Sequence, residues 1–261
     1  MTEDIAIHWF RQDLRLRDNP ALCRAAQSGL LLPVFILDDN NAGEFRPGAA
    51  SRWWLHHALD ALSQSLNGQL RIYLGDAETI LCRLVADYSV KTVCWNRCYE
   101  PWQIKRDKRI KKTLSDAGIS VMSFNGSLLW EPWQVLKKDQ SHYKVFTPFF
   151  RKGCLNATPP REPAELPEQL SIAEGCFQES SLAKLDLLPK IRWDKSLEAH
   201  WKISEEDAVD RLQAFIDHDL ADYKEGRDFP AKKTVTRLSP FIHWGQISPN
   251  QIWWDIQKQT D

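Results

Sequence analysis

The sequence predicts an α/β fold: a five-stranded parallel Rossmann-like sheet with helices on both faces, then a long connector and the first helices of an all-α domain. Three observations predict this order. Apolar runs alternate with amphipathic stretches through the first half of the chain. Residues Asn125 to Pro189 are rich in Pro, Ser and charge, and helical periodicity returns after Trp193. We therefore expect an α/β domain over 1–130, a connector over 131–195 and an incomplete, truncated helical domain over 196–261.

The predicted elements alternate between strand and helix. Each strand is a short apolar run, and each helix repeats apolar residues at intervals of three or four. Pro33 indicates the start of the second strand, residues 38–41 predict a turn, and Ser204 predicts a helix N-cap. The predicted strands are 5–10, 31–37, 70–74, 92–95 and 118–124, and the helices between them begin at Pro20 or span 48–66, 77–88 and 102–117.

Two segments are expected to hold the fold in place. The loop after the first strand carries Arg11, Asp13, Arg15 and Asp18, and we expect these side chains to pair with one another and fix the loop. The aromatic run Tyr143 to Phe149 is expected to anchor the connector against the sheet domain.

The carboxyl ends of the strands are candidate ligand positions, because open parallel sheets bind ligands there. These ends carry Arg11, Asp38, and Asn96 with Tyr99. The chain has no G-x-G-x-x-G and no P-loop motif, so a standard dinucleotide or P-loop domain is excluded. A strand-end loop without a ligand fits the same residues equally well.

The composition is that of a globular protein with 26% charged residues and a net charge of -1. Any contact with nucleic acid must therefore come from a local patch, and the basic run 105–112 is expected to be a solvated helix face. No apolar run approaches a membrane span and no signal-peptide pattern opens the chain. Of six cysteines only Cys94 and Cys98 are close in sequence, which favours reduced thiols in the cytoplasm and no metal.

Two Ser-Pro pairs, at Ser239 and Ser248, predict helix N-caps followed by Pro at the first helical position. Hydroxyls at Thr234 and Thr236, together with Arg237, come just before the first of these helices. Free backbone N–H groups, the helix dipole and small hydroxyls suit an anion, most often a phosphate. Ordinary helix capping explains the same pattern.

Four runs resemble signatures of the DNA photolyase and cryptochrome family. They are Trp9-Phe-Arg-x-Asp-Leu-Arg-x-x-Asp-Asn19, Asn96-Arg-x-Tyr-Glu-Pro101, the run from Tyr143 to Phe149, and the run from Tyr223 to Pro249. The resemblance implies a Rossmann-like N-terminal domain and the beginning of a helical FAD-binding domain. Because only the front part of the family pattern is present, we expect a truncated photolyase.

By position, the resemblance implies a set of FAD contacts and one DNA contact. The FAD contacts are Tyr223, Val235, Thr236, Arg237, Leu238 and Ser239, and the DNA contact is Arg227. Val235 stands where the family usually has a hydroxyl residue, so it can offer only its backbone. No catalytic side chain is expected, since in such proteins the flavin carries the redox chemistry.

The resemblance implies a deoxyribodipyrimidine photo-lyase, which repairs cyclobutane pyrimidine dimers in damaged DNA by light-driven electron transfer from reduced FAD. The dimer must leave the duplex to reach the flavin. A second antenna chromophore of the folate or deazaflavin type is implied, although Trp102 and Gln103 stand where some members have the Asn-Glu that binds folate. A cryptochrome-like blue-light photoreceptor and a non-catalytic nucleotide-binding module stay open. We expect a cytoplasmic monomer that binds FAD weakly by itself and shows no repair.

Overall fold

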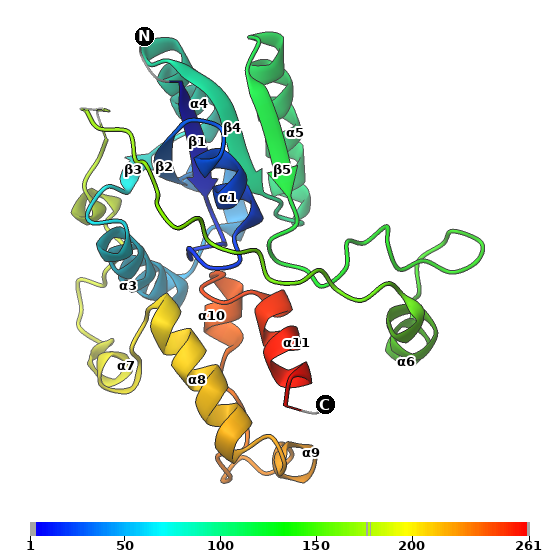
Figure 1. Ribbon diagram of the computed structural model, residues 1–261. Helices are drawn as coiled ribbons and strands as arrows, with labels where there is room; N and C mark the ends of the chain where they lie inside the picture. The colour runs from blue at the N-terminus through cyan, green and yellow to red at the C-terminus, as the bar shows by residue number, and fades with distance from the viewer. Residues whose placement is uncertain (1–3, 176, 178, 260–261) are drawn as a thin grey trace.

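The computed structural model describes residues 4–175, 177 and 179–259. Its centre is a five-stranded parallel sheet with the strand order β3-β2-β1-β4-β5 (Figure 1). The strands are β1 (Ile5–Phe10), β2 (Leu30–Leu37), β3 (Arg71–Leu74), β4 (Val90–Asn96) and β5 (Ser120–Phe124). The predicted α/β fold with a five-stranded parallel sheet is therefore confirmed.

Helices cover both faces of this sheet, and the side chains of β1 show why. Ala6 and Phe10 point into one apolar cluster, whereas Ile7 and Trp9 point into the other, as the two-residue period of a strand requires. The first cluster is completed by α1 (Pro20–Ala26) and α3 (Ala49–Ser65), and the second by α4 (Ala77–Asp87) and α5 (Pro101–Asp116).

Two local predictions are wrong. Residues 38–41 begin a short helix, α2 (Asp39–Ala42), because the Asp38 carboxylate caps it by accepting the N–H of Asn41 at 3.2 Å. Pro33 lies inside β2, opposite His8 of β1. Since β3 pairs with β2 only from Val34 onward, Pro33 has a partner strand on one side only, and its missing N–H is tolerated there.

The C-terminal helices lie beyond the carboxyl ends of the strands, next to α3, and their buried side chains belong to the first apolar cluster (Figure 1). The ring of Trp54 contacts Trp201 at 5.1 Å and Phe241 at 4.9 Å between centroids, and its Nε1 donates to Gln246 Oε1 at 2.8 Å. Ser204 caps its helix as predicted. These helices are α7 (Lys195–His200), α8 (Glu205–His218), α9 (Tyr223–Gly226), α10 (Ser239–His243) and α11 (Pro249–Gln257).

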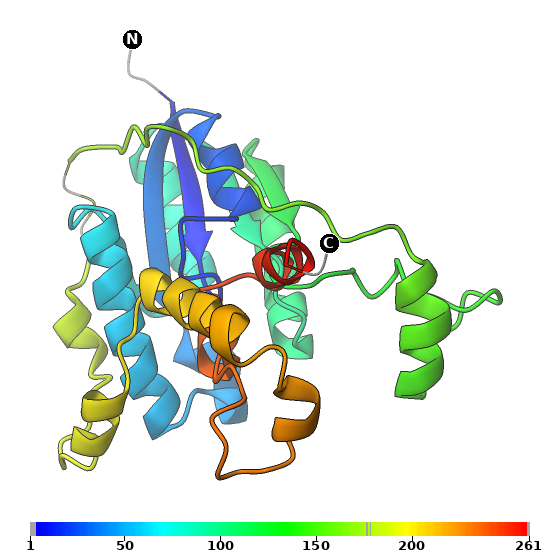
Figure 2. The ribbon, with the colours of Figure 1, turned by 60° about the horizontal axis from the view of Figure 1, so that its bottom comes forward.

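The connector is mostly irregular and joins the sheet by two isolated bridges, Leu31 with Ile172 and Ile72 with Ser180. Its segment around α6 (Phe146–Pro148) extends away from the sheet in Figures 1 and 2. The Phe146 side chain is 73% exposed, so the prediction that this aromatic run anchors the connector against the sheet domain is wrong. The short helical turns of the chain are η1 (Gly43–Phe45), η2 (Phe149–Gly153), η3 (Cys154–Asn156) and η4 (Leu182–Leu185).

Within the described residues, no helix is long and apolar enough to cross a membrane, and no cluster of His, Cys, Asp or Glu could hold a metal ion. Five cysteines are free thiols: Cys23, Cys82, Cys94, Cys98 and Cys154. Cys176 lies outside the described residues.

Candidate functional site

The loop after β1 joins the sheet to the C-terminal helices. Arg15 is 1% exposed, and its guanidinium donates to the carbonyl oxygens of Gly245 at 2.8 Å, Gly126 at 2.6 Å and Asp18 at 2.8 Å. The Asp18 carboxylate accepts a hydrogen bond from the hydroxyl of Ser248, which also caps α11 as predicted. The loop is thus fixed by partners far away in the sequence.

Asp13 is the buried acid of this loop, 2% exposed. It accepts the backbone N–H of Arg11 at 2.7 Å and the side-chain amide of Asn96 at 2.6 Å, and His8 Nε2 lies 3.5 Å away. Burial alone would raise the pKa of Asp13, but the hydrogen bond and charge of His8 and the N–H of Arg11 outweigh burial and hold the pKa at about 2. Because its amide donates to the buried Asp13, Asn96 is held inside the protein and is not available to bind a ligand at the strand end.

The prediction that the four charged side chains pair with one another is wrong, because none of them forms an ion pair with another within the described residues. Two contacts inside the loop involve the backbone: the Arg11 N–H donates to Asp13, and the Arg15 guanidinium donates to the Asp18 carbonyl. Arg15 also donates to the carbonyl of Gly245, which has φ +68° and lies so close that no side chain would fit against the Gln12 carbonyl. Beside it, the Leu14 N–H donates to the Trp244 carbonyl at 3.0 Å. Arg15 and Asp18 thus meet Gly245 and Ser248 of the helical part, whereas Arg11 pairs with Asp107 of α5.

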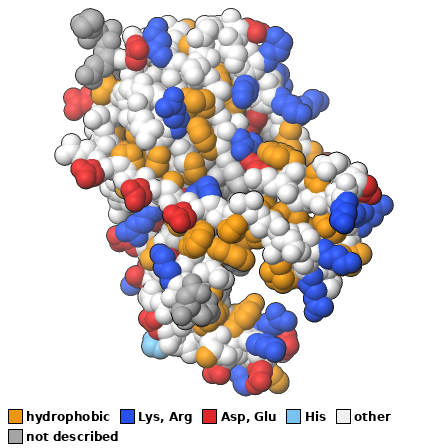
Figure 3. Space-filling view, turned by 45° about the vertical axis from the view of Figure 1, so that its right-hand side comes forward, with side chains coloured by type: hydrophobic (Ala, Val, Ile, Leu, Met, Phe, Trp, Pro, Cys, Tyr) orange, Lys and Arg blue, Asp and Glu red, His pale blue; other side chains and the backbone are white. Residues whose placement is uncertain are grey.

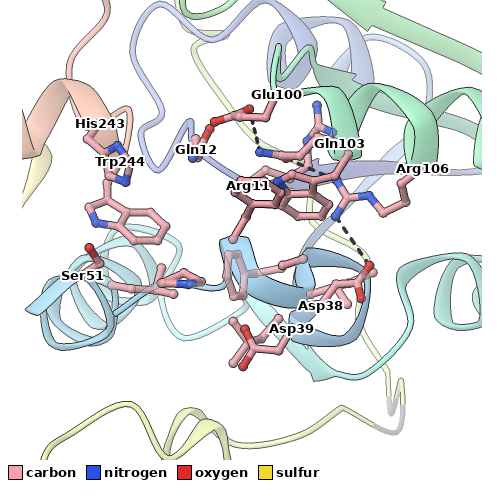
Figure 4. Close-up of a pocket in the computed structure, with 18 of the residues that line it drawn as sticks. Arg11, Gln12, Asp38, Asp39, Ser51, Glu100, Gln103, Arg106, His243 and Trp244 are labelled. Carbon is pink, nitrogen blue, oxygen red and sulfur yellow. Dashed lines mark hydrogen bonds and ion pairs between the residues drawn. The ribbon is translucent and has the colours of Figure 1, made fainter. Parts of the chain in front are cut away.

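A hollow of about 370 Å³ opens at the carboxyl ends of β1 and β2 (Figure 4). Arg11 and Asp38, two of the predicted strand-end residues, line it. His243 and Trp244 at the end of α10 form the opposite wall, so the hollow lies between the sheet and the helical part. Tyr99 lines a separate, smaller hollow and donates to Glu131 Oε2 at 2.8 Å.

Three charged residues of this sheet-end pocket, Arg11, Asp38 and Arg106, are buried and paired. Arg106 is 5% exposed, lies 3.5 Å from Asp38 Oδ2, and donates to Asp107 Oδ1 at 2.9 Å. Its guanidinium lies 4.8 Å from the ring centroid of Trp9 and 4.9 Å from that of Trp102. The exposed face predicted for residues 105–112 is therefore wrong at Arg106. The sequence could have shown that Arg106 points inward, because it lies four residues before Ile110, on the same face of the helix.

Arg11 of this pocket has unused hydrogen-bonding capacity. One guanidinium nitrogen pairs with Asp107, while Nε and Nη2 are buried and have no partner within the described residues. A buried donor without a partner costs free energy, so a ligand that brings acceptor oxygens would be stabilised here. The pocket suits a planar aromatic ligand that carries an anionic group.

The predicted flavin segment starts at Tyr223, the first residue of α9. Its ring is 38% exposed and packs edge-on against Phe215 with 5.7 Å between centroids. Gly226 lies so close to Thr234 that no side chain fits between them, and this contact places α9 beside the run that leads to Ser239. Thr234 Oγ1 is buried and has no hydrogen-bond partner within the described residues.

The predicted cap at Ser239 is wrong. The helix α10 begins at Ser239 itself, and Leu238, in the N-cap position, makes no side-chain cap hydrogen bond. The hydroxyl of Thr236 accepts the Leu238 N–H at 3.3 Å, while Arg237 turns the chain with φ +52°. The Ser239 hydroxyl is therefore not used for capping.

The remaining predicted residues differ in exposure. Val235 is 42% exposed and Leu238 only 2%, so the Leu238 side chain belongs to the core and only its backbone can reach a ligand. The Arg227 side chain is exposed, with its guanidinium carbon 5.8 Å from the ring centroid of Tyr223. None of Tyr223, Thr236 and Ser239 lines the hollow at the sheet end or its smaller neighbour.

The family model described as DNA photolyase matches residues 6–168, which is more than half of the chain. The chain belongs to the DNA photolyase family. It is 42% identical over 252 residues to the deoxyribodipyrimidine photo-lyase of Agrobacterium fabrum, covering 95% of this chain and 52% of that protein.

Two further relatives show how widely this part of the family is shared. Cryptochrome-2 of Arabidopsis thaliana is 34% identical over 94% of this chain and 42% of its own length. The crystal structure of a class III photolyase from Agrobacterium tumefaciens superposes with a TM-score of 0.91 at 40% identity, covering 97% of this chain and 53% of that one. The chain thus spans about half the length of these members of the DNA photolyase family.

Proposed function

We propose that this protein serves light-driven repair of cyclobutane pyrimidine dimers in DNA, as a deoxyribodipyrimidine photo-lyase that uses FAD. The observation that carries the proposal is the 42% identity to the Agrobacterium photolyase, which extends over 95% of the chain and includes the run from Tyr223 to Ser239. Because Tyr223 and Val235 lie open to solvent, we also propose that the chain alone binds FAD weakly and does not repair DNA.

The flavin segment offers groups that fit an FAD diphosphate. The hydroxyl of Ser239 is not used as a cap, and the buried Thr234 Oγ1 lacks a partner. We propose that Thr236 and Ser239 donate to phosphate oxygens and that Arg237 supplies positive charge. Tyr223 and the backbones of Val235 and Leu238 complete the FAD contacts. When bound, reduced FAD would supply the light-driven electron transfer that splits the dimer.

Arg227 is proposed to contact the DNA backbone. Its guanidinium is exposed, and its nearest acid, Asp228, lies 3.8 Å away on the surface. An exposed pair of this kind contributes little to stability, so the cation is available to a phosphate. That the protein is cytoplasmic and monomeric stays a prediction from the sequence.

The sheet-end pocket is proposed to hold the second chromophore. The unpartnered nitrogens of Arg11 suit an anionic group, and the rings of Trp9 and Trp102 supply aromatic walls. The carboxamide of Gln103, which also lines the pocket, donates to Glu100 Oε2 at 2.8 Å. Folate and deazaflavin chromophores both combine a planar ring with anionic groups, so the pocket chemistry suits either one.

Titration of the purified chain with FAD, followed by flavin absorbance, tests the cofactor assignment. Replacing two hydroxyls in Thr236→Val/Ser239→Ala should weaken FAD binding by about tenfold or more, since each lost hydrogen bond to a charged oxygen is worth roughly 1.5–3 kcal/mol. Ser65→Ala, at an exposed helix position far from the segment, is the matched control. Unchanged affinity in the double variant would refute the site, and stoichiometric FAD in the purified chain would refute weak binding.

A cryptochrome-like photoreceptor is the second candidate, favoured by the 34% identity to Arabidopsis cryptochrome-2. Fusion of this chain to the unmatched part of the Agrobacterium photolyase, assayed with dimer-containing DNA under blue light, separates the two. Light-dependent repair supports the photolyase function, whereas a fusion that binds FAD without repair supports the photoreceptor. A fusion that binds no FAD would support the third possible function, a non-catalytic nucleotide-binding module.

A further inference from the structure

The Pro-rich part of the connector, residues 158–165, passes between α1 and α11 in Figures 1 and 2. At one end of it, the Glu165 carbonyl accepts the thiol of Cys23 in α1 at 3.1 Å. The lobe around α6 that comes before it packs only loosely on α11, because a hollow of about 630 Å³ lies between them, lined by Tyr143 on one side and Trp253 on the other (Figure 3). Residues 158–165 are thus the part of the connector that reaches both the sheet domain and α11.

Three prolines shape this segment and leave it with free carbonyl acceptors. Pro159, Pro160 and Pro163 have a restricted φ and no N–H group, and residues 158–165 form neither helix nor strand. Side-chain donors from elsewhere bind the carbonyls instead. Trp130 Nε1, for example, donates to the Thr158 carbonyl at 2.8 Å. Because prolines reduce the freedom of the unfolded chain, such a segment loses less entropy than an ordinary loop when it becomes ordered.

The backbone of Arg161 makes the contact with α11. Its carbonyl oxygen accepts the side-chain amide of Asn250 at 2.9 Å and the indole N–H of Trp254 at 2.9 Å. Asn250 is fully buried and lies four residues before Trp254, so both donors stand on the same face of the helix. One carbonyl oxygen therefore binds two successive turns of α11.

The side chain of Arg161 makes the contact with the sheet domain. Its guanidinium pairs with the Asp18 carboxylate, which also accepts the Ala164 N–H at 2.8 Å. Asp18 is 2% exposed, lies in the loop after β1, and binds the Ser248 hydroxyl at the start of α11. Hydrogen bonds between two charged groups are among the stronger ones in proteins. The same residue thus holds the loop with its side chain and α11 with its backbone.

We propose that residues 158–165 form a strap that fixes α11 to the sheet domain, with Arg161 as its positioning residue. Because one residue binds both sides of the junction, loosening its contact with Asp18 also loosens its contact with α11. The strap and α11 therefore open together, as a local unit distinct from the packing of Phe241 in α10 against Trp54. The proposal does not depend on flavin binding.

Hydrogen exchange of the tryptophan indole N–H groups, measured by NMR on the isotope-labelled chain, tests the strap. In Arg161→Met the carbonyl of residue 161 is still present, so Trp254 and Trp130 keep their acceptors. Their N–H groups should nevertheless exchange about tenfold faster or more, because a charged hydrogen bond that holds the strap closed is lost. The indole of Trp54, which donates to Gln246, is the reference and should change by less than about twofold.

Two further variants sharpen the test. Arg151→Met removes an exposed arginine of the same connector and should leave the exchange of all three indoles unchanged. Trp254→Phe removes the donor on α11 while it keeps an aromatic ring, and its missing signal identifies the Trp254 indole in the spectrum. This variant should speed the exchange of Trp130, although Arg161 is intact.

Unchanged exchange of Trp254 in Arg161→Met would overturn the proposal, because the two contacts of Arg161 would then be independent. Equal acceleration at Trp54 would also overturn it, since the chain would then open as a whole. The strap fails as well if Arg151→Met acts like Arg161→Met, because the effect would then follow from the lost charge alone. If Arg161→Met does not fold, Trp254→Phe decides: unchanged exchange of Trp130 refutes the strap, and faster exchange supports it.

Discussion

Gly245→Ala is expected to destabilise the protein strongly, because this position joins the sheet to the helical part. An alanine with φ near +68° costs about 1–2 kcal/mol by itself. Its methyl group would also meet the Gln12 carbonyl, and the shift that relieves this contact pulls on two hydrogen bonds. These are the bond from Arg15 to the Gly245 carbonyl and the bond from Leu14 to the Trp244 carbonyl, worth roughly 1.5–3 and 0.5–1.5 kcal/mol. We expect a total loss of about 3–6 kcal/mol.

Urea unfolding followed by circular dichroism measures this loss as a lower midpoint at an unchanged slope. Gly68→Ala is the matched control, since Gly68 has φ +76° and no atom within 4 Å of an added methyl group. It should lose only the backbone cost of about 1–2 kcal/mol. If the two variants differ by less than about 1 kcal/mol, the contact with Gln12 does not hold the two parts together, and our reasoning about the loop fails.

Two further predictions concern the same loop. Ser248→Ala should cost about 1–3 kcal/mol, because it removes a cap and a partner of the buried Asp18, whereas Ser239→Ala, which removes no cap, should stay within about 0.5 kcal/mol. Urea midpoints compare the two, and equal losses would contradict the capping assignments. The pKa of Asp13, about 2 against an ordinary 3.8, adds stability that is present above pH 4 and is lost as the pH falls toward 2. The shift corresponds to a contribution on the order of 2 kcal/mol. Asp13→Asn should flatten this acid-side loss in urea titrations at several pH values, and an unchanged pH dependence would refute the role of Asp13.

The sheet could be predicted from the sequence because its signals are local. The central strands β1, β2 and β4 are runs of apolar residues that are buried almost throughout, and the long helices have one apolar face, so period and length suffice to place them. The observed ends of the strands differ from the predicted ends by a few residues. For example, β4 spans Val90–Asn96, whereas 92–95 was predicted. Capping was predicted where one side chain decides it, at Ser204 and Ser248.

The site could be predicted only in part, because its contacts join residues far apart in the chain. Arg15 and Gly245 are 230 positions apart, and no local pattern pairs them. The same distance explains the error at Arg106, which looks like one of several helix cations until Trp9 and Asp38 are placed around it. The helix α10 begins at Ser239, one residue earlier than predicted, because the buried side chain of Leu238 fixes the preceding turn.

The two candidate ligand sites are not independent, because α10 belongs to both. Ser239, at its first residue, is the proposed phosphate contact, while His243, at its last residue, lines the sheet-end pocket. Between them Phe241 is fully buried against Trp54, so the five-residue helix moves as one piece. A ligand that shifts α10 at one end therefore changes the affinity at the other, and such coupling is reciprocal. FAD titrations with and without a pocket ligand, and pocket-ligand titrations with and without FAD, should change the two affinities by the same factor, whereas two unrelated sites would show no change in either.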